Sequence, residues 1–402
     1  MKRYTGASRC LLSMFLLQGA LVTASLFLSA ADCRTVYGSE VKLTPACELK
    51  EEFNDNVFLT AGNKKNDFIT TITPGLGFLH SSERLTIDLL AGLSWHDYAR
   101  TSGVATTDYQ YTGQLATRIT QRDDLGLNAA YIRNTRPDTI TTSTGLPTTS
   151  GSSTYQYSGN MRRLLDETTS AALSYSFNKA EYDNPASEAS RVHSAGLVFS
   201  KDLGELMPRL KGTLNTNFSR SLYSFSHNDI YTVSVGASRS ITEQLNLNLS
   251  AGEQLIHSAL DTVPQRRSDS WESIGSASLN YTAEQGFGAF SVTHNFTPAS
   301  GQVGAVLTST FALSLGRNLS DKTTAQCAAS YNLNRADKGQ YASRGVDDRA
   351  LNLNAGITYK FSNYFDISLQ YAYYTVNNVL DDQTVSQNRI MVRAVSKYPF
   401  TW

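Results

Sequence analysis

A serine, a histidine and an aspartate on one short segment are the residues best suited to hydrolytic chemistry. Ser94 and His96 stand two residues apart, and Asp88 precedes them. A serine hydrolase needs its nucleophile within hydrogen-bond reach of a base that a third group orients. Nothing nearby in the sequence supplies an oxyanion hole. We therefore predict no catalytic residues, and an outer-membrane hydrolase is the weakest of our hypotheses.

Metal and thiol chemistry have little support in the sequence. The six histidines are scattered, and none stands at ligand spacing from cysteine or acidic residues, so we predict no metal site and no cofactor. Asp347 and Asp348 form an acidic pair in a segment that we expect to be an outer loop. A solvated loop accounts for this pair better than a binding site for a divalent ion. Cys47 and Cys327 fall on apolar faces. A Cys33–Cys47 disulfide, which the periplasm would permit, stays open.

The composition indicates a single domain that does not bind nucleic acid. The 402 residues include 35 basic and 35 acidic ones, and only 17% are charged, against about 25% in typical soluble proteins. No Pro-rich or charged linker divides the chain. There is also no basic stripe or tail, which excludes nucleic acid as a partner.

The first residues have the pattern of a secretory signal peptide. The start is basic, residues 10–28 are mostly apolar, and small residues lead up to Ala31. We predict cleavage near Ala31, which leaves residues 32–402 as the mature domain. An uncleaved membrane anchor is the alternative. A lipoprotein is excluded because Asp32 stands directly before Cys33, where a small residue would be expected.

The main signal of the mature chain is alternation of apolar and polar residues with a period of two. It is clear in residues 85–96, 245–252 and 351–360, whereas a helix would place apolar residues three and four apart. After Ala31 no apolar run is long enough for a spanning helix. Because lipid admits only helices and closed sheets, we predict an all-β fold, a transmembrane antiparallel up-and-down β-barrel of about eighteen strands.

The expected strands are long and their connections alternate in length. Most have ten or more residues, enough to cross a bilayer at a tilt. Short connections such as 81–84 alternate with long ones such as 54–66 and 137–152, as in bacterial barrels, and an even strand count places both termini in the periplasm. A soluble sandwich would have shorter strands, and a solenoid would show a fixed repeat. The predicted strands are 40–53, 67–80, 85–98, 107–120, 125–136, 153–164, 168–182, 190–201, 209–223, 229–241, 245–257, 269–282, 287–297, 303–316, 323–334, 346–361, 365–376 and 385–402.

Aromatic residues gather near the expected strand ends. In transmembrane barrels such residues form girdles at the two membrane interfaces, although aromatic residues favour strands in any case. We expect one girdle from Tyr109, Tyr111, Tyr155, Tyr157, Tyr231 and Trp271, and the other from Tyr281, Tyr359, Phe361 and Phe365.

An eighteen-stranded barrel encloses an aqueous lumen. The polar faces of the strands carry mostly Ser, Thr, Asn and Gln, with charges of both signs rather than the single-sign ring of an ion filter. Such a wall suits a hydrated neutral solute such as a sugar chain, although any wet lumen must be polar. The charged or titratable candidates for lining it are Asp88, His96, Asp108, Arg118, Arg162, Lys211 and Lys360.

The opening of the mature chain carries a recognisable pattern. Residues 51–59 read Glu-Glu-Phe-Asn-Asp-Asn-Val-Phe-Leu, and Asp-Phe-Ile-Thr at 67–70 and Thr-Pro-Gly-Leu at 73–76 follow. This pattern resembles the outer-membrane β-barrel porin family that accompanies exopolysaccharide loci, including loci linked to exosortase sorting systems. The terminal Trp402 looks like the aromatic signal that the outer-membrane assembly machinery reads, although that family often ends in Phe.

The resemblance implies a passive conduit for exopolysaccharide in the outer membrane of a Gram-negative bacterium. Its partners would be outer-membrane lipid, the assembly machinery through Trp402, the exopolysaccharide and periplasmic export proteins. It carries over no catalytic residues. A general or solute-specific diffusion porin is the alternative. The loop 137–152, rich in Thr and Ser, either serves adhesion outside the barrel or folds inward as a constriction.

Overall fold

The computed structural model describes residues 39–104, 107–141, 144–148, 150–185, 187–224, 226–260, 266–298, 305–336 and 345–402. The predicted signal peptide and Cys33 lie outside these residues. Within the described ranges, the structure has no helix with the length and apolar character needed to cross a membrane.

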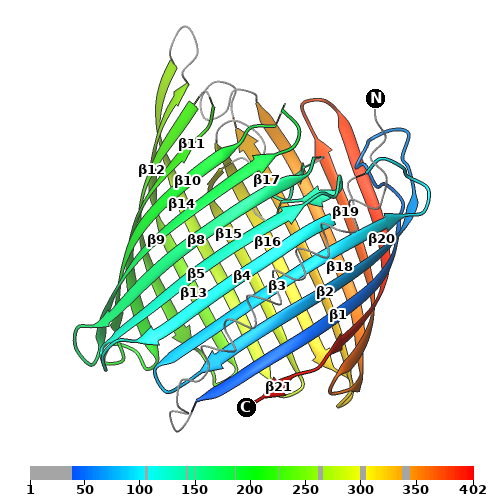
Figure 1. The fold of residues 1–402 in the computed structure, drawn as a ribbon. Coiled ribbons are helices and arrows are strands. Elements are labelled where there is room, and N and C mark those ends of the chain that lie inside the picture. The colour runs from blue at the N-terminus through cyan, green and yellow to red at the C-terminus, as the bar shows by residue number, and fades with distance from the viewer. Residues whose placement is uncertain are drawn as a thin grey trace.

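Eighteen long strands form one closed antiparallel barrel (Figure 1). Each strand pairs with its neighbour in the chain, and the last long strand pairs with the first and closes the ring. This confirms the predicted fold. The strands are β1 (Glu40–Asn54), β2 (Asp67–Ser81), β3 (Leu85–Tyr98), β4 (Thr107–Arg118), β5 (Asp123–Asn134), β8 (Ser152–Leu164), β9 (Thr169–Tyr182), β10 (Ser190–Asp202), β11 (Leu210–Leu222), β12 (Ser226–Ser240), β13 (Leu245–Leu260), β14 (Arg266–Ala283), β15 (Gly286–Pro298), β16 (Ala305–Asn318), β17 (Thr323–Ala336), β18 (Val346–Ser362), β19 (Phe365–Asn378) and β20 (Gln383–Lys397).

Three short strands complete the fold. Strands β6 (Thr139–Ile140) and β7 (Pro147–Thr148) pair only with each other, in the connection between β5 and β8. Strand β21 (Phe400–Thr401) pairs with β1 beyond the end of β20. The predicted last strand, 385–402, is therefore two strands. The break falls at Pro399, which has no N–H to donate to the β1 ladder.

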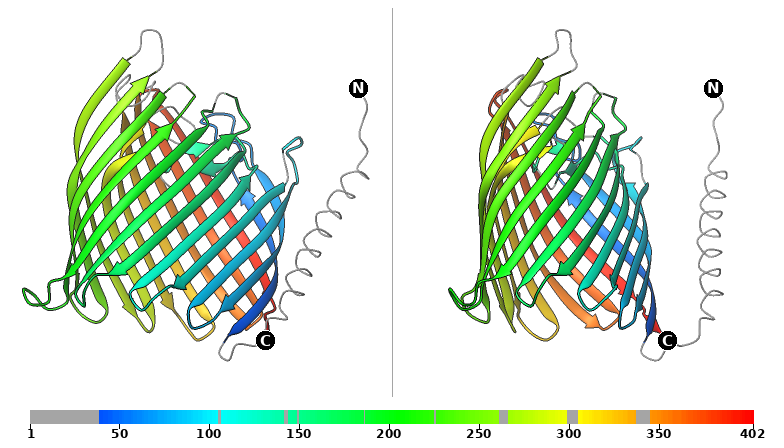
Figure 2. Two further views of the ribbon diagram at one scale, coloured as in Figure 1. Left: turned by 60° about the vertical axis from the view of Figure 1, so that its left-hand side comes forward. Right: turned by 90° about the vertical axis from the view of Figure 1, so that its left-hand side faces the viewer.

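The two ends of the barrel differ, and we name them by their connections. At the turn end, where the C-terminus lies, connections such as 82–84 and 363–364 are short (Figure 2). At the loop end they are longer, as in 55–66 and 135–151. The expected asymmetry of bacterial barrels places the turn end in the periplasm and the loop end outside the cell.

The register gives each strand an apolar outer face. Leu93, Leu249 and Leu313 point outward and are exposed in the isolated molecule, as lipid-facing residues must be. Exposed aromatic residues lie toward both ends of this face, Trp271 nearer the loop end and Phe361 at the turn end. The alternation follows from the two-residue period of a strand, which sends neighbouring side chains to opposite sides of the wall.

The inner face is polar and hydrogen-bonded to itself over much of its area. Ser238 donates to Asn248 at 2.6 Å, and the Asn248 amide donates to Ser278 at 3.1 Å. These contacts run from β12 across β13 to β14. Ser250 and Ser276 share a further hydrogen bond of 2.7 Å. On these three strands the lumen wall is thus a neutral surface of hydroxyl and amide groups.

Candidate functional site

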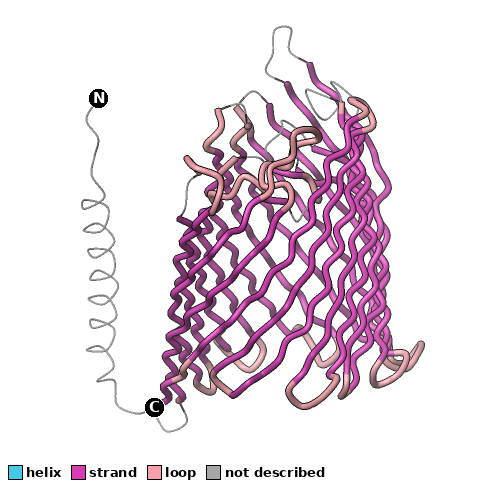
Figure 3. Tube along the Cα trace, turned by 90° about the vertical axis from the view of Figure 1, so that its right-hand side faces the viewer, coloured by secondary structure: helices cyan, strands magenta, loops and turns pink. Residues whose placement is uncertain are grey.

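The loop 135–151 folds into the lumen and reaches the far wall. Loops gather within the loop end of the barrel (Figure 3). At the tip of this loop, the Gly145 carbonyl accepts a hydrogen bond of 3.0 Å from the Tyr374 hydroxyl. The Thr144 carbonyl accepts one of 2.7 Å from the Asn334 amide. The loop starts at the end of β5, whereas Asn334 lies on β17. Around the barrel, the strands between these two are β4, β3, β2, β1, β20, β19 and β18. The loop therefore crosses the lumen, and of the two hypotheses for it, the constriction agrees with the structure.

An apolar cluster holds the tip of the loop in place. Leu146 from this loop and Leu59 from the loop 55–66 are buried against Ala350, Tyr374 and Val376 on the inner faces of β18 and β19. Such burial stabilises a contact by about 25 cal/mol for each Å² of apolar surface removed from water. Two loops thus share one packed core with the barrel wall, which favours a fixed constriction over a freely moving flap.

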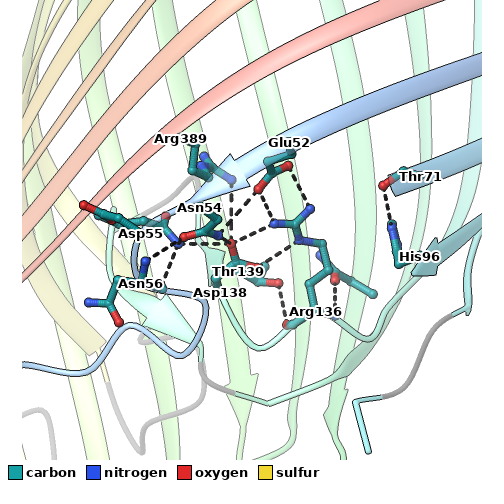
Figure 4. Close-up of polar contacts among 12 residues, drawn as sticks. Glu52, Asn54, Asp55, Asn56, Thr71, His96, Arg136, Asp138, Thr139 and Arg389 are labelled. Atoms are coloured by element: carbon teal, nitrogen blue, oxygen red, sulfur yellow. Dashed lines mark hydrogen bonds and ion pairs between the residues drawn. The ribbon is translucent and has the colours of Figure 1, made fainter. Parts of the chain in front are cut away.

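A buried ion pair anchors the base of the loop (Figure 4). The Arg136 guanidinium donates to both carboxylate oxygens of Glu52 on β1, at 2.6 and 3.0 Å. The same group donates to both oxygens of Asp138, at 2.9 and 2.8 Å. The side chains of Glu52 and Asp138 are fully buried, and that of Arg136 is 10% exposed. The planar fork of an arginine suits such paired recognition of carboxylates.

Neutral and basic groups complete the surroundings of Asp138. Asn54 donates to its Oδ2 at 2.8 Å and Gln387 at 3.1 Å, while the Arg389 guanidinium lies 4.0 Å away. Both acceptor oxygens of Asp138 are therefore occupied, as a buried charge requires. We name Glu52, Arg136 and Asp138 the loop anchor.

The two loop residues of the loop anchor, Arg136 and Asp138, stay ionised at neutral pH. Burial by itself lowers the pKa of Arg136, but the carboxylates of Asp138 and Glu52 outweigh it and hold that pKa well above its usual value. Burial raises the pKa of Asp138, but the Arg136 guanidinium outweighs this effect and the pKa is lowered. Removing one member of such a group leaves an uncompensated buried charge, which is strongly destabilising.

The structure does not assemble the hydrolase constellation. The Ser94 hydroxyl shares a hydrogen bond of 2.8 Å with Thr73 rather than with His96. His96 faces inward but is buried at 3% exposure, with Nδ1 at 3.0 Å from Thr71 and Nε2 at 2.8 Å from Asp108. The expectation that His96 lines the wet lumen is thus corrected, because both ring nitrogens are taken up within the wall.

Asp108 also supports the start of the constriction loop. Its Oδ1 accepts hydrogen bonds from the backbone N–H and the hydroxyl of Thr135, at 2.6 and 2.7 Å. Thr135 directly precedes Arg136. The pair of His96 and Asp108 therefore positions the first residue of the loop, which is a structural role.

The other predicted lumen residues face inward toward the turn end, and most of them have an opposite charge beside them. These residues are Asp88, Arg118, Arg162, Lys211 and Lys360. In the strand registers Asp124 pairs with both Arg118 and Arg162, Lys211 pairs with Asp202, and Lys360 pairs with Asp366. This alternation produces no single-sign ring, so this end of the lumen has the features of a mixed-charge mouth rather than an ion filter.

The acidic pair Asp347 and Asp348 lies on strand β18, not in an outer loop as expected. Adjacent residues of a strand point to opposite faces, so the two carboxylates cannot converge on one cation. Among the residues that the structure describes, no group of three His, Cys, Asp or Glu side chains could hold a metal ion. Cys47 and Cys327 are exposed free thiols.

Sequence reasoning missed the loop anchor. Its available signal was Arg136-Pro137-Asp138, a basic and an acidic residue directly after a strand, together with Glu52 in the segment that suggested the porin resemblance. Nothing in the sequence connects these two segments, because the contact arises only when the loop enters the barrel.

Comparisons with known proteins agree with a porin-type barrel. Residues 274–398 match the family described as "Putative beta-barrel porin 2". This confirms the predicted resemblance to a β-barrel porin family, although in a different part of the chain from the opening segment that suggested it. A search of curated proteins finds no match.

Several solved structures are similar to this barrel. OccAB4 of Acinetobacter baumannii is 11% identical, with 90% of this chain and 98% of that chain covered and a TM-score of 0.46. OccAB3 of the same species is 10% identical, with coverages of 90% and 99% and a TM-score of 0.47. A BenF-like porin from Pseudomonas fluorescens Pf-5 is 10% identical, with coverages of 91% and 99% and a TM-score of 0.47.

The closed barrel, its apolar outer face and its polar lumen define a class. Transmembrane barrels built in this way belong to outer membranes, and the molecule has the fold of an outer-membrane β-barrel, with a match to a porin family over residues 274–398. Within that class, its site is a lumen crossed by one anchored loop.

Proposed function

We propose that this protein is a passive outer-membrane conduit for neutral, hydrated carbohydrate, with an exopolysaccharide strand as its cargo. The observation that carries the proposal is the hydrogen-bonded stretch of hydroxyl and amide groups on the inner wall, with Ser238, Asn248 and Ser278 joined across three strands. Such groups both donate and accept hydrogen bonds. They can therefore exchange partners with sugar hydroxyls as a chain slides past.

The charges of the lumen support a neutral cargo. At the turn end, basic residues such as Lys211 and Lys360 stand next to acidic partners in the strand register. At the loop end, Arg136 is compensated by two carboxylates. A lumen without a dominant sign of charge gives no electrostatic preference for an ion, so selection falls to size and hydrogen bonding.

A diffusion porin for small solutes is the second candidate, and the constriction loop favours it. The loop reaches Tyr374 and Asn334 on the far wall and thus divides the outer half of the lumen. A narrowed passage suits a small solute more than a polymer, unless the loop moves aside during export.

Planar-bilayer conductance of the purified protein tests the conduit. We expect open currents that the native polymer blocks reversibly when it is added on the turn side. A silent protein, or currents that the polymer leaves unchanged, would contradict polymer transport. The diffusion porin would be favoured if small sugars enter liposomes that contain the protein and make them swell, while the polymer does not block the current.

A deletion strain supplies the cellular test. If the protein exports the polymer, deletion should trap polymer inside the cell while synthesis continues. Normal surface polymer in that strain would count against export and leave the diffusion porin in place.

The route to the membrane is also part of the proposal. Residues 1–31 would direct secretion across the inner membrane, and the terminal Trp402 would be read by the assembly machinery. In the barrel, the backbone of Trp402 exchanges two hydrogen bonds of 3.0 Å with Val41. Deleting Trp402 should lower the fraction of heat-modifiable barrel in the outer membrane, with export across the inner membrane unchanged.

A further inference from the structure

A row of inward-facing residues crosses five neighbouring strand pairs on one side of the lumen. Each residue is the register partner of the next, from β15 to β20. The row consists of Phe287, Gly316, Gln326, Gly356, Gln370 and Met391. Larger side chains alternate with glycine along most of it, so the larger ones have room to lie along the wall.

The row connects the two functional ends of the lumen. Phe287 is the second residue of β15 and lies at the turn end. Met391 is the register partner of Glu52, close to the loop end of β1. Because the strands are steeply tilted (Figure 1), a line of register partners climbs the wall. The row therefore leads from the periplasmic mouth to the loop anchor.

The glycines shape this row. A Cβ atom at Gly316 would collide with the Phe287 ring, which shows that the ring lies directly over the backbone of β16. A Cβ at Gly356 would come within 3.1 Å of the Gln370 side chain. Phe287 nevertheless remains 47% exposed, and its inward register directs that exposed face to the lumen.

The wall is hollowed at this row. A cavity of about 300 Å³ is lined by Phe287, Gln326, Gln370 and Met391, with Asn354 at its side. A second hollow of about 200 Å³ adjoins it, and the two share Ser314, Ala328 and Asn354. The inward residues of the second hollow are mostly alanine and serine. Together the two hollows form a shallow groove with an aromatic ring at its lower end.

The amides of the groove are available to a ligand. In the described part of the chain, the side chains of Gln326, Asn354 and Gln370 make no hydrogen bond to other protein groups. By contrast, Asn248 on β13, two strands before the start of the row on β15, is engaged on both sides. An amide carries two donors and two acceptor sites, so these three groups can serve a solute rather than the wall.

We propose that this row is a saccharide-binding track, which deepens the proposed function and rests on it. The Phe287 ring would stack on the apolar face of a pyranose ring. Gln326 and Gln370, two strand spacings or roughly 10 Å apart, would bind hydroxyl groups of the same chain. An apolar surface with a few converging polar groups is the usual construction of a small-molecule site. A neutral sugar fits these groups, and an ionic solute does not.

Block of the bilayer current by a neutral linear malto-oligosaccharide tests the track. Phe287→Ala should weaken the blocking affinity roughly three- to tenfold, the range expected for loss of one aromatic contact, with the open current unchanged. Phe290→Ala is the matched control, since Phe290 lies on the same strand but faces outward and is 46% exposed. Phe290→Ala should leave block by the sugar unchanged. Block by polyethylene glycol of equal size should be the same for the wild type and for both variants.

Gln326→Ala combined with Gln370→Ala provides a second variant, which should weaken block by the sugar but not by polyethylene glycol. Heat-modifiable migration in gels confirms that each barrel is assembled. Equal block of wild type and both variants by the sugar would overturn the track while the conduit stands. If the wild type carries no current, the conduit fails, and calorimetric titration of the detergent-solubilised protein with the same sugar decides the track. The track is supported if the wild type binds the sugar and Phe287→Ala binds it more weakly. It is overturned if the wild type does not bind the sugar, or if both proteins bind it equally.

Discussion

Arg136 and Glu52 stand 84 residues apart in the chain and form a two-pronged ion pair with N–O distances of 2.6 and 3.0 Å. Glu52 belongs to the barrel wall and Arg136 to the loop that crosses the lumen. This one contact therefore fixes where the constriction begins, and it makes the width of the channel depend on a buried charge.

Arg136→Ala should release the loop. The substitution leaves Glu52 and Asp138 buried without their guanidinium, which costs about 3–5 kcal/mol for a buried pair that loses one partner. The buried carboxylates recover their hydration if the loop leaves the wall. The lumen then widens, so single-channel conductance should rise.

A pair near the barrel rim provides the control for this substitution. Arg133, on strand β5, pairs with Asp183 at 2.6 Å, and the Asp183 side chain is half exposed. Exposed pairs contribute only about 0–1 kcal/mol, so Arg133→Ala should leave conductance unchanged. Equal conductance in wild type and Arg136→Ala would mean that the apolar cluster alone holds the loop.

Tyr374→Phe should loosen the tip of the loop without releasing its base. The change removes the hydrogen bond to the Gly145 carbonyl, and leaving a buried polar group unpaired costs about 1–3 kcal/mol. We expect more current noise and faster amide exchange at the loop tip. Tyr371→Phe is the control, because the Tyr371 hydroxyl bonds to Asn388 on the exposed outer side. Identical noise in the two variants would exclude a role for the Gly145 contact.

The loop anchor should not respond to pH in the physiological range. The pKa of Asp138 is lowered in the fold, so its contribution is complete above its unfolded value of about 3.9 and is lost as the pH falls through the folded value. The pKa of Arg136 is raised, so its contribution is lost only in strong alkali. Conductance and protease resistance of the loop should therefore be constant from about pH 5 to 8. A transition inside that window would show that another group controls the loop.

Arginine substitutions at two adjacent residues should distinguish the lipid-facing side of the wall from the lumen-facing side by their effect on stability. Leu313→Arg places a charge in lipid, which costs about 2–4 kcal/mol at the middle of the bilayer. Ala312→Arg on the inner face keeps its charge in water. Urea unfolding in lipid vesicles should show a large loss of stability for the first variant and little for the second. The reverse order would mean that the assigned faces are inverted.

The sequence by itself determined the barrel. Alternation in segments such as 85–96 and 351–360 reports the two faces of each strand, because the two-residue period of side chains is a local property of an extended backbone. Short turns and aromatic strand ends are local as well. Even the break of the last strand traces to a single residue, Pro399, whose missing N–H can be read from the sequence.

Only the tertiary structure decided what occupies the lumen. The inward path of the loop 135–151, the pairing of Arg136 with Glu52 and the row from Phe287 to Gln370 all join residues that are far apart in the chain. Strand register and barrel closure bring them together, and a register depends on the sum of many pairings rather than on any local pattern. For the same reason His96 looked like a lumen residue in the sequence, while the fold buries it against Thr71 and Asp108.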